Sequence, residues 1–142
     1  MPARLLAVGL TVCTALTLMP ETAAATPSHG VQARTIAQRT VGDVEYVLRE
    51  ITIAPGGSTG WHYHDGRLYA VVRAGTLTRT LADCTTTMVH PRGDVVVEPS
   101  GPDHVHIGRN LGTTPVVLEA LYVNPVGRPL AQDVPNPGCG FR

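Results

Sequence analysis

Short hydrophobic runs separated by turn-forming residues make up most of the chain after residue 40. Each run has four to eight residues and is rich in Val, Ile, Leu and Thr, as is typical of β-strands. The runs are Val41 to Leu48, Arg49 to Ile53, Leu68 to Arg73, Thr76 to Leu81, Thr85 to Val89, Val95 to Glu98, Val105 to Arg109 and Val116 to Val123. Gly and Pro clusters such as Pro99-Ser100-Gly101-Pro102 separate them, and no stretch has a helical period. The pattern predicts an all-β sandwich or barrel.

Different patterns flank the predicted barrel. Residues 26–40 are mostly polar or small and lack a clear period, which predicts a flexible lead-in. The barrel itself is expected at residues 41–124. Four prolines in residues 125–142 exclude a helix or a central strand, so we expect this tail to lie extended against the barrel. The length of 142 residues suits one domain.

The first 25 residues have the pattern of a secretory signal peptide. Arg4 precedes an apolar run from Leu5 to Leu18, and the small residues Ala23-Ala24-Ala25 follow. We expect cleavage after Ala25 and export of the product, with no membrane attachment afterwards. The alternative, an uncleaved anchor, is disfavoured because the run is too short to cross a bilayer comfortably.

Charge and cysteine content narrow the functional classes. The eleven basic residues are all arginines and balance eleven acidic residues, without the basic stripe that nucleic-acid binding requires. Cleavage would leave two cysteines, Cys84 and Cys139, in an oxidising compartment. We expect a disulfide between them, the alternative being two buried thiols. Signatures of hydrolases and nucleotide-binding enzymes are missing from the sequence.

Two HxH pairs carry the most informative chemistry in the chain. They are His62 with His64 and His104 with His106. Because alternate side chains of a strand lie on the same face, both imidazoles of each pair would point the same way. Two such pairs on neighbouring strands would gather up to four imidazoles around one point, which predicts a metal site.

The order of glycines, histidines and prolines resembles that of the cupin superfamily over roughly Ile53 to Val123. Its first motif contains a glycine, an HxH pair, a glutamate and a second glycine. The matching residues here are Gly56 or Gly57, His62, His64 and Gly75. The glutamate is missing, because Leu68 and Tyr69 occupy the two positions open to it.

The second cupin motif nominates two different histidines. Gly93 and the Pro99-Ser100-Gly101 turn lead to His104 at the motif spacing. The motif ends in an asparagine, and Asn110 has the matching distance from His106 rather than from His104. We favour His104 as the third ligand, since the turn fixes the entry into the strand, and keep His106 as an alternative or additional ligand.

The resemblance implies a small double-sheet jelly-roll barrel that holds one divalent transition metal. Three neutral imidazoles suit Fe, Zn, Cu or Ni, whereas a carboxylate would favour harder ions such as Mn. Without the glutamate, we expect a more electrophilic metal with open positions. Tyr69 is a weak candidate for a catalytic acid. Candidate partners for the second ring nitrogens are Glu98, Glu119, Asp103 and Tyr69.

Two classes of function remain open at this point. In the first, the metal acts on a small organic substrate, as in the cupin dioxygenases that lack the glutamate. In the second, the barrel binds a small molecule or a metal without catalysis, and a metal-free degenerate barrel is a further alternative. The low aromatic content of 4% favours a small polar or aliphatic ligand. The resemblance leaves a homodimer open as well.

Overall fold

The computed structural model describes residues 24–142, so the predicted signal peptide lies almost entirely outside the described residues. Within residues 24–142 the protein is all-β, apart from a single 3-10 turn. No helix in this part of the chain is long and apolar enough to cross a membrane. The elements are β1 (His29–Val41), β2 (Val44–Ser58), β3 (His62–Tyr63), β4 (Arg67–Ala74), β5 (Thr76–Leu81), β6 (Thr87–Pro91), β7 (Val95–Glu98), η1 (Pro102–His104), β8 (His106–Arg109), β9 (Val116–Pro125) and β10 (Gln132–Asp133).

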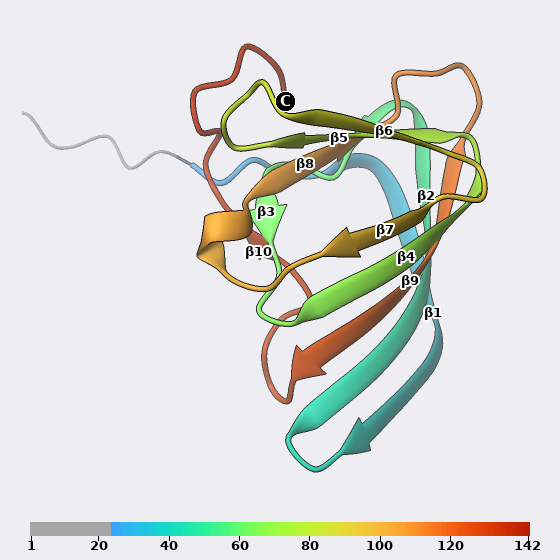
Figure 1. Cartoon of the computed structure of the whole chain (residues 1–142), viewed down its shortest axis with the longest axis vertical. Coiled ribbons are helices and arrows are strands. Elements are labelled where there is room, and N and C mark those ends of the chain that lie inside the picture. The colour runs from blue at the N-terminus through green and yellow to red at the C-terminus, as the bar shows by residue number, and fades with distance from the viewer. Residues whose placement is uncertain (1–23) are drawn as a thin grey trace, which may run out of the picture.

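The strands form one nearly closed barrel sheet, which confirms the predicted jelly roll (Figure 1). The order along the sheet is β10-β3-β8-β2-β9-β4-β7, with β1 beside β2 and β6-β5 beside β8. The long strand β2 connects the two halves: residues 44–53 pair with β9, and Ser58 pairs with Arg109 of β8. This topology brings β3, β7 and β8 to the same end of the barrel, where the candidate site lies.

Strand β1 occupies most of the segment in which we expected a flexible lead-in. It pairs antiparallel with β2 from His29 opposite Ser58 to Val41 opposite Val44. Figure 1 shows the two strands as a long hairpin whose turn extends beyond the neighbouring strands. Of the thirteen residues of β1, all except Val31 are exposed. Backbone pairing with β2 therefore holds this strand, and hydrophobic alternation, the signal used to predict strands, is missing from it.

The main core is built by alternate residues of the barrel strands. In β9 every second residue is buried, and in β4 Leu68, Ala70 and Val72 are buried while Tyr69 points outward. The cluster comprises Val47, Ile53, Leu68, Ala70, Val72, Leu77, Val96, Val116, Leu118, Ala120 and Tyr122. Burial of these apolar side chains is the main force that closes the barrel.

A second, smaller core joins the C-terminal tail to the barrel. Trp61, Ile107 and Cys139 are buried together, and the Trp61 ring stacks on Phe141 with centroids 5.9 Å apart. Cys139 forms the expected disulfide with Cys84. The tail also adds the short strand β10 to β3, so it lies extended against the barrel as predicted.

Candidate metal centre

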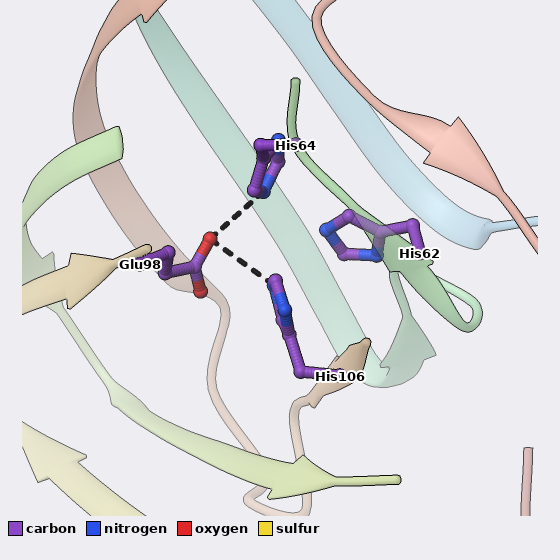
Figure 2. Close-up of side chains that lie close together, drawn as sticks. All are labelled: His62, His64, Glu98 and His106. Atoms are coloured by element: carbon purple, nitrogen blue, oxygen red, sulfur yellow. Dashed lines mark hydrogen bonds and ion pairs between the residues drawn. The ribbon is translucent and has the colours of Figure 1, made fainter. Parts of the chain in front are cut away.

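Four buried side chains, from three strands and the loop after β3, meet inside the barrel. His62 begins β3, His64 follows β3, Glu98 ends β7 and His106 begins β8. His62 and His106 are direct partners in the β3/β8 ladder, and their ring centroids are 4.4 Å apart. One nitrogen or oxygen atom from each of the four residues lies within 4.8 Å of the others. Figure 2 shows the four side chains directed toward a common centre.

Backbone carbonyl groups fix the orientation of all three imidazoles. Each Nδ1 lies within hydrogen-bond distance of a carbonyl oxygen: 3.0 Å from His62 to Gly60, 2.6 Å from His64 to Leu130 and 2.9 Å from His106 to His104. A carbonyl oxygen can only accept, so each Nδ1 carries the hydrogen and donates it. In the neutral ring Nε2 then carries no hydrogen and can bind a metal; without a metal, the contact between His64 Nε2 and Glu98 Oε2 requires a proton between the two atoms. Metal-binding histidines are commonly held in this way.

Glu98 supplies a carboxylate between the imidazoles and an arginine. Its Oε2 lies 2.9 Å from Nε2 of His64 and 3.1 Å from Nε2 of His106 (Figure 2). Its Oε1 lies 3.0 Å from Nε of Arg79, which is also buried. Burial by itself would raise the pKa of Glu98, but the neighbouring imidazoles of His106 and His64 outweigh it and hold the pKa well below its usual range. The group is therefore a carboxylate in the folded protein.

The protonation and bonding of the imidazoles fit a metal ion. Burial, followed by the neighbouring His106 and His64, lowers the pKa of His62 to about 3, so this ring is neutral at ordinary pH. His106 Nε2 is buried and makes no well-directed hydrogen bond, despite its short distance from Glu98. A divalent cation would satisfy this orphaned nitrogen. Three imidazole nitrogens and one carboxylate oxygen together form a donor set that suits transition metals.

The structure brings His106 to the cluster and not His104, contrary to our preference. His104 is exposed on the 3-10 turn η1, which closes with a hydrogen bond of 3.1 Å from its N–H to the Gly101 carbonyl. This turn occupies the positions just after Gly101 and delays the start of β8 to His106. His104 contributes its backbone carbonyl to His106 instead. The spacing to Asn110 therefore pointed to the histidine that lies in the cluster. Asn110 is buried and bonds the carbonyls of Ile53 and Thr114.

The expected absence of a carboxylate from the site is also corrected by the structure. Leu68 occupies the glutamate position on β4, and Glu98 is its direct partner across the β4/β7 ladder. The carboxylate thus comes from the neighbouring strand. Alternation in β7 could have revealed this, because Val96 and Glu98 are buried while Val95 and Val97 are exposed.

Three other residues that the sequence suggested, as a catalytic acid or as hydrogen-bond partners of the histidines, lie away from the cluster. Tyr69 is on the outer face of β4 and is 39% exposed, so it does not line the cavity. Asp103 is exposed on η1, and the partly exposed Glu119 lies 3.9 Å from Arg73. The tyrosine near the site is Tyr122 of β9, whose ring centroid is 5.7 Å from that of His64.

A cavity of about 60 Å³ adjoins the four side chains. Its walls are largely apolar and include Leu68, Ala70, Leu77, Val96 and Leu118. One water needs roughly 10–15 Å³ of such volume, so there is room beside a metal for a few waters or one small group. The site thus combines fixed ligands with open space.

The comparisons with known proteins agree with this geometry. The family model described as Cupin domain matches residues 49–124. The chain belongs to the cupin family. Within the matched range lie all four members of the buried cluster. No curated protein matches the sequence of this cupin.

Several solved structures share the fold at low sequence identity. The polyketide cyclase RemF from Streptomyces resistomycificus is 22% identical with a TM-score of 0.62, over 82% of this cupin and 86% of RemF. The cupin-2 domain Rru_A2000 from Rhodospirillum rubrum is 16% identical with a TM-score of 0.60, over 75% of this chain and 66% of that chain. KdgF from Halomonas sp. is 17% identical with a TM-score of 0.54, over 68% and 82%. At these identities the likeness shows the fold alone.

Proposed function

We propose that this cupin binds one divalent transition metal ion through His62, His64, Glu98 and His106 and uses it in chemistry on a small organic molecule. The observation that carries the proposal is the orientation of the imidazoles. Three Nδ1 hydrogens donate to backbone carbonyls, and the three Nε2 atoms face one another and the Glu98 carboxylate. A purely structural histidine cluster has no need for three parallel orienting bonds.

Open coordination positions favour a reactive over a structural metal. Four protein ligands leave two positions of a six-coordinate ion for water or substrate, and the adjoining cavity provides the space. A bound ion would supply Lewis acidity, and iron or copper would also supply the redox chemistry of a dioxygenase-like reaction. The protein's own part is to hold the ligands and to surround the reacting groups with apolar walls. Glu98 also lowers the net charge of a divalent site from +2 to +1.

Elemental analysis of protein purified without a metal-affinity tag tests the proposal. We expect about one metal ion per chain in the wild type and its loss in a His62→Ala/His64→Ala variant. His106→Ala should also lose the metal. His104→Ala is the matched control, because it keeps the backbone carbonyl that orients His106, and it should retain the metal. A wild type that holds no metal after reconstitution with Fe, Zn, Cu, Ni and Mn would refute the proposal.

The element that binds then selects the reaction class. Iron or copper would direct the search to oxygen-consuming reactions of small substrates, whereas zinc would direct it to non-redox chemistry or to binding without turnover. Oxygen uptake with candidate substrates, measured in the wild type and in the His62→Ala/His64→Ala variant, separates an oxygenase from a binding protein.

We also propose that the protein acts outside the cytoplasm. The signal-peptide pattern ending at Ala25 and the Cys84–Cys139 disulfide support this location. N-terminal sequencing of protein recovered from the medium or periplasm should begin at Thr26. Recovery of the full-length chain in the cytoplasm with both thiols free would contradict the proposal.

A further inference from the structure

An arginine lies on the inward face of β2, close to the candidate metal centre. Val47 and Ile53 of this strand are buried, and Ile51 lines the inner cavity. Arg49 lies between Val47 and Ile51 in the same alternation, so its side chain belongs to the inward-facing set. Charged residues are rare in such positions unless a partner neutralises them.

Arg49 has no partner within residues 24–142. Its Nε is buried without a hydrogen-bond acceptor, and the side chain takes part in none of the ion pairs of this part of the chain. Four other arginines form ion pairs: Arg34 with Glu50, Arg73 with Glu119, Arg79 with Glu98 and Arg128 with Asp65. Arg109, whose Nε is also buried without an acceptor, instead lies over the Phe141 ring and bonds Thr80. A guanidinium that is partly desolvated and unpaired is set up to bind an anion.

A hollow of about 300 Å³ connects Arg49 with the metal centre. Its wall includes Arg49, Thr59, His62, His64 and Tyr122, and it shares all of these except Arg49 with the inner cavity. Asp133 lies at its rim but is more than 4.0 Å from the guanidinium, since the two form no ion pair. A molecule in this hollow would therefore touch Arg49 on one side and the metal ligands on the other.

We propose that Arg49 binds the carboxylate of a small organic acid whose opposite end reaches the metal. The proposal rests on the proposed function and names its substrate class. A planar guanidinium matches a carboxylate with two parallel N–H···O bonds, which would fix one end of the molecule. Tyr122, Thr59 and Ser28 are further hydroxyl groups on this wall, and Asp133 is the acidic residue among those that line it. The volume of the hollow is at the small end for ligand sites.

Calorimetric titration with matched acids and amides tests the proposal. The probes are pyruvate and benzoate beside pyruvamide and benzamide, each titrated into metal-loaded and metal-free protein. We expect the acids to bind the wild type at least about tenfold more tightly than the amides, and Arg49→Gln to weaken acid binding by about tenfold or more while leaving the amides unchanged. Arg39→Gln, which removes an exposed charge from β1, should bind like the wild type.

Three results would overturn the proposal. These are equal binding of the acids and amides to the wild type, equal binding of the acids to wild type and Arg49→Gln, and tighter Arg49-dependent binding of inorganic phosphate than of either acid. Metal content and the melting temperature of each variant are measured in parallel, so that a lost site or a misfolded chain is recognised, and Arg49→Lys serves as a second variant. If the wild type holds no metal, the proposed function fails, but the metal-free titrations still decide whether Arg49 binds carboxylates.

Discussion

Exchange of Leu68 and Glu98 tests the origin of the carboxylate at the metal centre. The two residues face each other across the β4/β7 ladder, and side chains paired in this way have Cβ atoms about 4.5–5.5 Å apart. Glu98→Leu should remove one metal ligand and lower metal affinity by at least about 100-fold, since even residues that only orient ligands contribute 10–100-fold. The double variant Leu68→Glu/Glu98→Leu returns a carboxylate to the site from the strand on which other cupins carry it. We expect it to regain most of the lost affinity.

The stability of the same variants follows from the ion pair with Arg79. Glu98 Oε1 lies 3.0 Å from Arg79 Nε, and both residues are buried. Removing one partner of a buried pair costs about 3–5 kcal/mol, because the other charge is left uncompensated. At about 4 °C per kcal/mol, Glu98→Leu and Glu98→Gln should melt roughly 10–20 °C below the wild type. Glu119→Gln is the matched control, because Glu119 is partly exposed and lies 3.9 Å from Arg73.

Competition with a chelating dye measures the affinities, and thermal denaturation followed by circular dichroism measures the stabilities. Wild-type metal affinity in a folded Glu98→Leu variant would show that Glu98 is not a ligand. If the double variant binds metal no better than Glu98→Leu, a glutamate at position 68 does not restore the site. That result would refute the inference that Glu98 of β7 takes the place of the glutamate that the cupin motif has on β4. A melting point of Glu98→Gln equal to that of Glu119→Gln would refute the role assigned to the Arg79 pair.

Three further predictions concern acid stability, the disulfide and the asparagine after β8. The pKa of His62 is about 3 in the folded protein, well below the ordinary histidine value of 6.5, so between these values the unfolded chain binds a proton that the folded chain does not. Stability of the metal-free protein should fall as pH drops below 6.5, by about 1.4 kcal/mol per unit down to pH 3. Urea unfolding at pH 7 and pH 5 should show a smaller loss in His62→Gln, and equal losses would contradict the assignment. Reducing the Cys84–Cys139 bond, which closes a separation of 55 residues, should cost about 4 kcal/mol in the same assay. Asn110→Ala removes the donor that bonds the carbonyls of buried Ile53 and of Thr114 and should cost about 2 kcal/mol. Unfolding of Asn110→Ala at the same urea concentration as the wild type would count against that role.

Local patterns predicted the barrel and placed His62 and His64 in the cluster, with His106 as the alternative to the favoured His104. Alternating runs identified the core strands, because burial of one sheet face imposes a period of two on the sequence. The HxH spacing placed His62 and His64 together for the same reason. The choice between His104 and His106 depends on the length of the turn after Gly101. The sequence did not give this length, because the first half of the second motif pointed to His104 and its terminal asparagine pointed to His106. The structure resolves this with the turn η1, which moves the strand start to His106.

Features that depend on pairing between distant strands escaped prediction. The sequence suggested Glu98 as a hydrogen-bond partner of a histidine. Its position opposite Leu68 follows from the register between β4 and β7, which cannot be read from the sequence. Strand β1 lacks alternation because its faces are exposed, so only its pairing with β2 reveals it. Arg49 belonged to a predicted strand, but its inward position became evident only when the faces of β2 were assigned.

The hydrogen bond between His64 and Leu130 has a consequence for biosynthesis. The two residues are 66 positions apart, and Leu130 lies in the tail that Cys139 ties to Cys84. During translation, His64 emerges long before the acceptor that orients its ring. The candidate metal centre reaches its final form only after the chain has been made as far as Leu130 and this segment has docked. Maturation of the site is therefore a late event, and a nascent or truncated chain that lacks the tail would present an incompletely organised set of ligands to any metal it meets.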